Sequence, residues 1–250
     1  MTPLVFSGAP RDDVAVPAAV LSYAAGAPIA PVWQNEVGGL TFRVDAPGGA
    51  VFVKWDPHGS IESLADEAER LTWLTGRFPA PRVVATGSDE SGEWLATAGI
   101  AALSAVTPTW RARPEVVVRA IAQGLRMLHD TLPGAECPFS WSVEARIQAA
   151  ARNGRTVPAE LHQAPPIDRL VVCHGDPCSP NTLLSASGEF AGIVDVGRLG
   201  VADRWADLAV ASMALGWNYG PGWEPLFFDT YGIDPDPVRI AYYRALWDAG

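Results

Sequence analysis

The stretch from Val171 to Gly200 constrains the fold more than any other part of this chain. Short apolar runs precede His174-Gly175-Asp176 and Asp195-Val196-Gly197, and a turn at Ser187-Gly188 separates the two. This order predicts loop, strand, tight turn, strand and loop, so both outer ends of the hairpin lie on one side. The hairpin then brings Asp176, Asn181 and Asp195 together at one rim. Two carboxylates and one amide, all oxygen donors, suit a hard cation such as Mg²⁺ together with a base.

Composition excludes several classes of protein. The chain has 250 residues and a net charge of −10, which argues against binding to nucleic acid because phosphate backbones need a basic face. It has no apolar run long enough for a membrane span and no signal-peptide pattern at its N-terminus. Its 3 cysteines are odd in number, which favours a reducing cytoplasm over a disulfide framework. An acidic chain favours cationic small molecules as partners, or simply solubility.

Only one lysine, Lys54, occurs among 18 lysines and arginines. An ammonium is a compact point charge and a guanidinium a planar fork, so a single lysine in an arginine-rich chain indicates a need for that chemistry. Lys54 lies in a strand-like run at the end of residues 32–55, which read as strand, Gly38-Gly39 turn, strand, turn and strand. Backbone at a Gly-Gly turn can approach a phosphate closely, although an ordinary hairpin explains the pair equally well.

Residues 60–76 predict a helix that Ser60 caps, with Glu62 and Glu67 in its first half. Glu67 shares the apolar stripe of this helix, so its carboxylate needs a cationic partner unless it is a solvated rim residue. Lys54 on the preceding strand is the natural partner.

The rest of the chain divides into a small lobe and a larger helical one. Residues 82–98 predict two more strands, which complete an antiparallel sheet of about five strands with one helix. Residues 1–98 then form an N-terminal nucleotide-binding lobe and residues 99–250 a C-terminal catalytic and substrate-binding lobe. The C-terminal lobe is expected to be mainly helical, with helices over 115–132, 142–163, 203–216 and 236–248 and an aromatic loop between the last two. His129 is read as a helix-terminal charge or hydrogen-bond partner.

The order of these pieces is more specific than any one of them. A glycine turn, a strand lysine, a helix glutamate, H-G-D-x-x-x-x-N and D-V-G resemble the phosphoryl-transfer set of kinases. His174-Gly175-Asp176, the segment VDVGRLGVADRWADLA and the C-terminal YYRALWD are similar to the aminoglycoside phosphotransferase family. They resemble above all its 3′-O-phosphotransferases, of the kanamycin and neomycin kinase type. The resemblance covers about residues 32–250 and implies an α+β, two-lobed protein-kinase-like fold.

The resemblance also implies roles for individual residues. Asp176 would accept the proton of the acceptor hydroxyl or orient that hydroxyl, and Asn181 and Asp195 would hold Mg²⁺ on the phosphates of ATP or GTP. Lys54, held by Glu67, would contact the α- and β-phosphates, and the adenine would pair with the Thr97 carbonyl and the Gly99 N–H. The remaining nucleotide-binding candidates are Gly38, Gly39, Thr41 and Arg198. Asp207 would tie its helix to the catalytic loop, and His174 would be a loop-packing residue.

The acceptor implied by the family is a hydroxyl group, first the 3′-OH, of an aminoglycoside antibiotic, whose phosphorylation gives resistance. Asp176, Glu224, Asp248 and the Gly250 carboxylate would bind its ammonium groups. Where the family usually has an acidic pair, this chain has Trp217-Asn218, with Glu224 the nearby acid. Two alternatives therefore stay open: a kinase of another hydroxylated metabolite or antibiotic, and a catalytically silent nucleotide-binding module. A zinc site at Cys173, His174 and Cys178 is disfavoured, because C-H-x₃-C matches no common zinc spacing.

Overall fold

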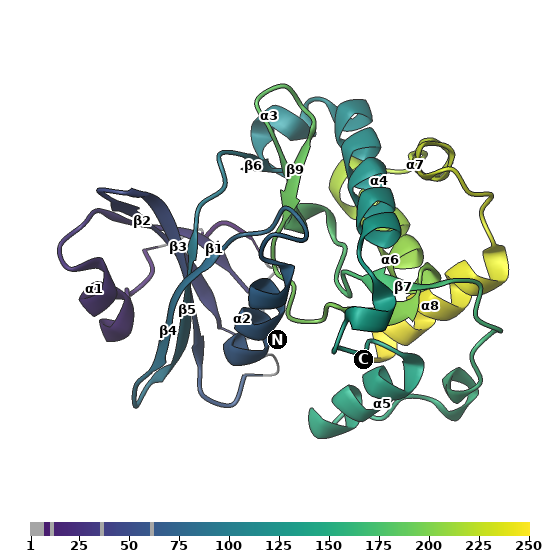
Figure 1. Ribbon diagram of the computed structural model, residues 1–250, viewed down its shortest axis with the longest axis horizontal. Helices are drawn as coiled ribbons and strands as arrows, with labels where there is room; N and C mark the ends of the chain where they lie inside the picture. The colour runs from purple at the N-terminus through teal and green to yellow at the C-terminus, as the bar shows by residue number, and fades with distance from the viewer. Residues whose placement is uncertain (1–7, 11–12, 36–37, 61–62) are drawn as a thin grey trace. The chain divides into compact units, whose positions relative to one another are not determined.

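The computed structural model describes residues 8–10, 13–35, 38–60 and 63–250 of the chain (Figure 1). Its contacts divide the chain into two compact units: unit 1 holds Met1–Thr75 and Pro81–Ile100, and unit 2 holds Gly76–Ala80 and Ala101–Gly250. The division therefore falls after Ile100 rather than after Ala98. Gly76–Ala80, which the sequence assigned to the N-terminal lobe, belongs to unit 2. Within unit 2, the Phe78 ring lies 5.8 Å from that of Phe190, and Ile193 N–H donates to the Pro79 carbonyl at 3.1 Å.

Unit 1 is a five-stranded antiparallel sheet, as the sequence predicts, and its described residues form two helices where the sequence predicted one. Its strand order is β1-β2-β3-β5-β4. The elements are α1 (Ala18–Ala24), β1 (Ile29–Gln34), β2 (Leu40–Ala46), β3 (Gly49–Pro57), α2 (Leu64–Leu74), β4 (Val83–Ser88) and β5 (Gly92–Ala98).

The alternation of side chains along β3 assigns each face of this sheet. Val53 packs with Ala96 in an apolar cluster that includes Val20 and Ala24 of α1. The next residue, Lys54, therefore points to the opposite face, together with Leu95, its partner on β5. That is the face on which Lys54 meets α2, because its ammonium contacts Glu67. Adjacent residues of β3 therefore serve the two faces of the sheet: Val53 packs in the apolar core, and Lys54 forms the ion pair with Glu67.

The helix that carries Glu67 begins later than the sequence predicted. Its N-cap is Ser63, whose hydroxyl accepts the Asp66 N–H at 3.3 Å, and not Ser60, whose hydroxyl donates to the Pro57 carbonyl at 2.9 Å. Both serines precede the apolar stripe, and only the path of the chain after β3 decides between them. Glu62 lies outside the described residues.

Unit 2 is mainly helical, with two small sheets, β10-β7 and β6-β8-β9. Its helices are α3 (Pro108–Arg111), α4 (Pro114–Thr131), α5 (Val143–Arg152), α6 (Trp205–Tyr219), α7 (Glu224–Tyr231) and α8 (Pro237–Ala249), with 3₁₀ turns at Gly134–Glu136, Ala159–His162 and Ser179–Asn181. Its strands are β6 (Leu103–Ser104), β7 (Leu170–Cys173), β8 (Thr182–Leu184), β9 (Phe190–Ile193) and β10 (Gly200–Asp203).

Helix α6 is the central element of this unit. Most of its side chains are buried, from Trp205 to Leu215, and it packs against α4, α7 and α8. A helix that is apolar on nearly all sides belongs in the interior. Its one buried carboxylate, Asp207, is therefore conspicuous.

Two predicted segments differ from the structure. The helix expected over 142–163 ends at Arg152, and only a 3₁₀ turn at Ala159–His162 follows. The aromatic loop expected after residue 216 is short, because Trp217–Tyr219 form the last turn of α6 and Glu224 begins α7. No helix in the described part of the chain is long and apolar enough to cross a membrane.

Candidate active site

The loop after β7 carries Asp176, and its shape depends on Gly175. Gly175 has φ +86°, and a Cβ atom there would lie 2.2 Å from the carbonyl oxygen of Arg198. Only glycine tolerates both this conformation and this approach. The loop that carries Asp176 therefore packs directly against the chain that follows Asp195.

Backbone and side-chain hydrogen bonds join the segments that carry the three oxygen-bearing residues predicted at one rim. Asn181 Nδ2 donates to the Asp176 carbonyl at 2.9 Å, and Val194 N–H donates to the Asn181 carbonyl at 3.0 Å. Asp195 follows Val194 with φ +62°, a left-handed conformation that few residues other than glycine adopt and that Asp and Asn adopt more readily than most. The hairpin of β8 and β9 thus places Asn181 beside both loops, as the sequence predicts.

The Asp176 carboxylate has an unusual environment. Its Oδ1 is buried and has no hydrogen-bond partner among the described residues. The Cys178 thiol lies beside this carboxylate, and burial first, then the negative charge of Asp176, raises the pKa of that thiol far above its usual range. A buried carboxylate oxygen without a donor is costly, so it indicates a site for a ligand that donates a hydrogen bond.

His174 holds the loop and does not offer a metal ligand. Its Nδ1 accepts the Asp176 N–H at 3.2 Å, and its Nε2 lies 3.1 Å from the Val194 carbonyl oxygen. Both ring nitrogens are therefore occupied. The Cys173 thiol is buried and donates to the Asp203 carbonyl at 3.5 Å. These contacts are incompatible with a zinc site at Cys173, His174 and Cys178, and they fit the loop-packing role expected for His174.

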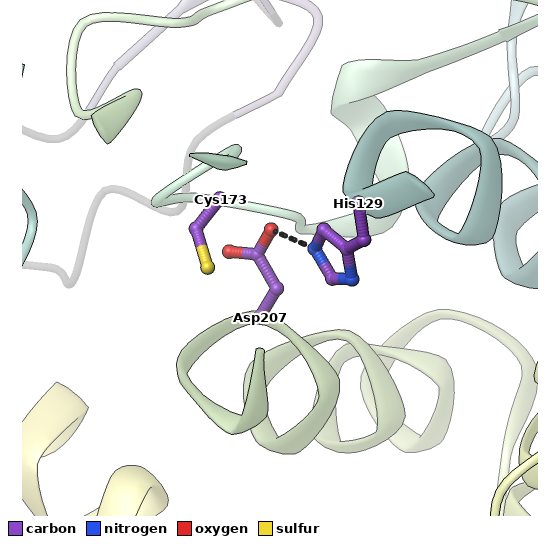
Figure 2. A group of neighbouring side chains, drawn as sticks. All are labelled: His129, Cys173 and Asp207. Atoms are coloured by element: carbon purple, nitrogen blue, oxygen red, sulfur yellow. Dashed lines mark hydrogen bonds and ion pairs between the residues drawn. The ribbon is translucent and has the colours of Figure 1, made fainter. Parts of the chain in front are cut away.

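Asp207 of α6 anchors the same loop. Its two oxygens accept the backbone N–H groups of His174 at 2.6 Å and of Gly175 at 3.0 Å. Burial alone would raise the pKa of Asp207, but the hydrogen bond from His129 and the nearby positive charge hold it below its usual value. Figure 2 shows this carboxylate between His129 and Cys173. The tie from helix to catalytic loop that the sequence suggested is present.

Arg198 lies between two tryptophans. Its guanidinium carbon is 5.7 Å from the Trp141 ring centroid and 5.3 Å from that of Trp247 on α8. Arg146 of α5 stacks on Trp141 as well, at 5.4 Å, and burial followed by repulsion from Arg198 lowers its pKa to about 10. Sequence reasoning missed Trp141, Trp247 and Arg146, because no local pattern joins residues so far apart.

Unit 1 holds the predicted ion pair. Lys54 Nζ lies 2.8 Å from Oε1 and 2.7 Å from Oε2 of Glu67. The Glu67 side chain is 6% exposed and that of Lys54 25%, so the carboxylate is sheltered while the ammonium still reaches solvent. Thr41 is the cross-strand partner of Lys54 on β2, which puts both side chains on one face of the sheet.

The glycine turn between β1 and β2 is stabilised by its own side chains. Gly39 N–H donates to Asn35 Oδ1 at 2.6 Å, and Gly38 N–H donates to the Asn35 carbonyl at 3.4 Å. A Cβ atom on Gly39 would lie 1.9 Å from Asp56 Oδ1, so a larger residue there would have to displace the Asp56 and Asn35 side chains. The turn can allow close approach of a phosphate, but its two glycine amides are used internally.

The predicted adenine contacts are only partly available. Gly99 N–H donates to the Ala50 carbonyl at 2.8 Å, so this amide already has a partner, and its assignment as the donor to adenine stays a prediction. This amide follows directly after the end of β5 and is bonded to the neighbouring strand β3. Thr97 lies within β5, opposite Phe52 of β3 and Val83 of β4, and its hydroxyl donates to the Phe52 carbonyl at 3.4 Å.

The acceptor-binding candidates have mixed surroundings. Glu224 pairs with Arg244 at 2.6 Å, and the Gly250 carbonyl oxygen accepts a hydrogen bond from Arg155. Asp248 lies on the exposed side of α8. Arginines thus already balance part of the negative charge that the sequence assigned to an amino sugar.

The lysine–glutamate pair of unit 1 and the two anchored loops of unit 2 define a phosphoryl-transfer enzyme built like a kinase. The chain belongs to the phosphotransferase enzyme family, whose pattern matches residues 34–243. The resemblance in fold class and family that the motifs suggested is therefore confirmed.

Several relatives and solved structures are similar over most of the chain. An aminoglycoside 3′-phosphotransferase of Streptomyces fradiae is 35% identical over 76% of this chain and 81% of its own. A crystal structure of an aminoglycoside 3′-phosphotransferase of type VIII is 32% identical, with a TM-score of 0.77 over 90% of this chain and 94% of its own. An aminoglycoside phosphotransferase from Streptomyces rimosus, solved with ADP and streptomycin, is 27% identical, with a TM-score of 0.68 over the same shares of both chains.

Proposed function

We propose that this chain transfers the γ-phosphate of ATP or GTP to a hydroxyl group of an aminoglycoside, in the first place the 3′-hydroxyl. The observation that carries this proposal is the set of hydrogen bonds that joins the Asp176 loop, Asn181 and the chain before Asp195. Phosphoryl transfer needs little covalent chemistry from the protein and depends on positioning and electrostatics.

Asp176 is the proposed catalytic residue. Its unpartnered Oδ1 accepts the hydrogen bond of the incoming hydroxyl, orients that oxygen towards the phosphorus and receives its proton as the bond to phosphorus forms. Its loop is held through Gly175 and His174 by Asp207, so the carboxylate does not need to be repositioned for each turnover.

The residues present fit Mg²⁺ as the metal on the nucleotide. Asn181 uses its Nδ2 to hold the loop, which leaves its oxygen as a hard donor, and Asp195, which follows the Val194 N–H bonded to the Asn181 carbonyl, would supply a carboxylate. Asn181 and Asp195 would hold the ion, and bound Mg²⁺ would neutralise charge on the β- and γ-phosphates. Arg198, stacked between Trp141 and Trp247, adds a further fixed positive charge in unit 2.

Lys54 is the proposed contact to the α- and β-phosphates, with Thr41 on the same face of the sheet and the Gly38-Gly39 turn allowing close approach. Glu67 contacts the ammonium with both carboxylate oxygens and so orients it. Thr97 stays the candidate for purine recognition. A relative crystallised with ADP supports a nucleotide as the co-substrate.

The aminoglycoside acceptor rests on two of the relatives named above, which are aminoglycoside 3′-phosphotransferases. Asp176, Asp248 and Gly250, with Glu224 in a lesser part, are the proposed contacts to its ammonium groups. A cytoplasmic enzyme is consistent with the cysteines, since no disulfide occurs among the described residues.

A transfer assay tests this function. Purified protein, Mg²⁺ and ATP or GTP are incubated with a panel of aminoglycosides that includes streptomycin and hygromycin B, and phosphorylated product is identified by mass spectrometry. Asp176→Asn is expected to lower kcat by about 10³-fold or more while nucleotide affinity stays within about twofold, because the base is lost and the phosphate contacts are kept. Strong transfer by this variant would rule out Asp176 as the catalytic residue.

A different hydroxylated amine is the second candidate acceptor. The ion pair of Glu224 with Arg244 and the 60% exposed Trp217, at a place where the family usually has an acid, favour an acceptor with fewer ammonium groups. Choline and amino alcohols therefore belong in the same panel. Transfer to one of them and to no aminoglycoside would replace the first acceptor class by the second.

A further inference from the structure

Arg198 lies in the turn that follows Asp195, directly against the loop that carries Asp176. A Cβ atom on Gly175 of that loop would lie 2.6 Å from the Arg198 Cβ atom. Burial is the main cause of the raised pKa of the Cys178 thiol, and the charges of Asp176 and Asp195 raise it further. The charge of Arg198 lowers the same pKa, so the guanidinium lies close to the thiol on which both carboxylates act.

Two indole rings contact this guanidinium. Its central carbon is 5.7 Å from the Trp141 ring centroid and 5.3 Å from that of Trp247, and all three side chains are half-buried. A ring face attracts a guanidinium within about 6 Å, and this contact occupies none of the N–H groups. Two such contacts therefore fix the charge in place without using the donors that bind a phosphate.

Trp141 is anchored to the strand that follows Arg198. Its N–H donates to the Val201 carbonyl at 3.0 Å, and Val201 N–H donates to the Phe139 carbonyl at 2.9 Å. Strand β10, which contains Val201, begins at Gly200, and a Cβ atom there would lie 2.8 Å from the Trp141 nitrogen. The Trp141 ring therefore starts from a backbone that is tied to the chain just beyond Arg198.

Trp247 is anchored from a different element. It lies in the last turn of α8, and Arg244, three residues earlier, holds α8 to α6. Arg244 Nε donates to the Ala209 carbonyl at 3.2 Å, and its Nη2 donates to the Ser212 hydroxyl at 2.9 Å. The two rings that contact Arg198 are thus fixed independently of each other and of the turn that carries it.

A second cation lies against the same stack. The buried Arg146 guanidinium is 5.4 Å from the Trp141 ring centroid, and burial followed by repulsion from Arg198 lowers its pKa to about 10. Its Nη1 has no hydrogen-bond partner among the described residues. Two guanidinium groups beside one ring repel each other, so the cluster favours the approach of an anion. The anion that the proposed reaction brings is a phosphate of the nucleotide.

Direct contact of Trp247 with the acceptor is the competing explanation, because the proposed acceptor contacts Asp248 and Gly250 follow it in the chain. Arg198 already lies over the Trp247 ring, which favours a role through that arginine. The two explanations differ in a measurable way. A ring that acts through Arg198 affects the bound nucleotide, whereas a ring that contacts the acceptor affects the KM of the acceptor.

We propose that Trp141 and Trp247 are positioning residues, which hold the Arg198 guanidinium where it meets the γ-phosphate that is transferred. The proposal rests on the function assigned above to the site of Asp176 and Asp195. It makes the last turn of α8, and the segment just before α5, part of the machinery that binds the nucleotide.

Five variants of the full-length chain test it. Trp141→Leu and Trp247→Leu each remove one ring, and Trp247→Phe keeps a smaller ring in place. Arg198→Ala is made alone and combined with Trp247→Leu. Trp110→Leu is the matched control, because Trp110 is a buried tryptophan of α3 over which Arg113 stacks at 5.3 Å.

The readouts are the Kd of AMP-PNP and of ADP by calorimetry with Mg²⁺, then kcat, the KM of the acceptor and the Tm. The guanine nucleotides replace these two if GTP is the preferred co-substrate. AMP-PNP and ADP differ by the γ-phosphate position, so the ratio of their Kd values reports on that phosphate alone.

We expect Trp141→Leu and Trp247→Leu to weaken AMP-PNP binding by about 3- to 30-fold, the range of a cation–π contact, with ADP binding within about twofold. In both variants kcat should fall by about 10-fold or more, with the acceptor KM within about twofold, because a misplaced charge stabilises the transition state poorly. Trp247→Phe should recover most of the AMP-PNP affinity. Trp110→Leu should lower the Tm and leave both Kd values within about twofold.

The double variant is the decisive comparison. If Trp247 acts through Arg198, Trp247→Leu should weaken AMP-PNP binding no further in the Arg198→Ala background. An equal further loss in that background would overturn the proposal. So would a raised acceptor KM with unchanged AMP-PNP affinity, or a Trp247→Phe variant that binds AMP-PNP no better than Trp247→Leu.

Failure of the proposed function is distinguishable from failure of this inference. It would appear in the unaltered protein, as absence of transfer to every acceptor of the panel. The comparison of AMP-PNP with ADP needs no acceptor, so it decides the positioning role in that case too. An unaltered protein that binds neither nucleotide would refute the proposed function and this inference together.

Discussion

At the scale of single residues, Lys54 shows how far chemical reasoning from sequence reaches. Lys54 is the one lysine among 18 basic residues, which indicated a requirement for an ammonium. In the structure its Nζ contacts both oxygens of the sheltered Glu67 carboxylate. A guanidinium is larger and planar, and its charge is spread over three nitrogens. It would therefore not present a compact positive charge to a phosphate while both oxygens of Glu67 contact it. The alternative of Glu67 as a solvated rim residue is excluded by its 6% exposed side chain.

This pair leads to a prediction for the nucleotide. Lys54→Ala is expected to lower kcat/KM for ATP or GTP by about 10- to 100-fold, since a charge-assisted hydrogen bond contributes on the order of 1.5–3 kcal/mol. Lys54→Arg should recover little of the loss. Steady-state kinetics with varied nucleotide measure both variants.

Arg43→Ala is the matched control for loss of a positive charge from the same sheet, because Arg43 forms an exposed pair with Asp45 on β2. It should leave kcat/KM within about twofold, as surface pairs contribute little. Unaltered kinetics in Lys54→Ala would refute the phosphate contact.

At the scale of elements, the start of α2 was decided by tertiary structure. Ser60 and Ser63 are both acceptable N-cap residues, and the pattern of leucines does not distinguish them. In the structure the Ser60 hydroxyl donates to the Pro57 carbonyl, at the end of β3. The Ser63 hydroxyl accepts the Asp66 N–H and is therefore the N-cap of α2. The first turn of α2 carries Glu67, so the cap also supports the ion pair.

Ser63→Ala is therefore expected to lower the free energy of unfolding by about 1 kcal/mol, the usual contribution of an N-cap hydroxyl. Ser60→Ala should change it by no more than about 0.5 kcal/mol, as for most surface substitutions. Urea denaturation of the two variants and the parent measures the difference. A larger effect at Ser60 would place the cap where the sequence had put it.

Other elements differ from their sequence-based prediction for related reasons. The polar segment 142–163 continues a helical pattern, yet α5 ends at Arg152. Trp217–Tyr219 look like part of a Gly/Pro-rich loop, yet α6 continues through them, with Tyr219 donating to the Ala105 carbonyl at 3.0 Å. Contacts with distant residues outweigh weak local propensity at such ends.

At the scale of the whole molecule, acid should destabilise the protein through its anchored carboxylates. The hydrogen bond from Arg204 lowers the pKa of Asp168, and hydrogen bonds and charge lower that of Asp207 against the effect of burial. A carboxyl whose pKa is lower in the folded state stabilises the protein above its ordinary pKa of 3.8, and this contribution is lost as pH falls through the lower folded value. Asp203, whose pKa burial raises, acts in the opposite direction.

Asp207→Asn tests this assignment. It should lower the free energy of unfolding at pH 7 by on the order of 3 kcal/mol, because buried donors lose their charged acceptor. The variant should also lose less stability than the parent between pH 4 and pH 2. Denaturant midpoints across that range measure both effects, and a parallel decline in the two proteins would contradict the role given to Asp207.

The sequence by itself determined the reaction class and most of the architecture. Fixed spacing along one hairpin suffices to bring Asp176, Asn181 and the Asp195 loop together, and alternation along β3 suffices to aim Lys54 away from the apolar core. These are short-range consequences of strand geometry.

Only the tertiary structure decided what surrounds these groups. The Ala50 carbonyl accepts a hydrogen bond from the Gly99 amide, and Arg244 forms an ion pair with Glu224, in each case from a separate element. The hydrogen bonds of His129 with Asp207 and Tyr231 likewise join α4 to α6 and α7, over 78 and 102 residues of sequence. Such pairings depend on how elements pack, and no local periodicity encodes which donor meets which acceptor.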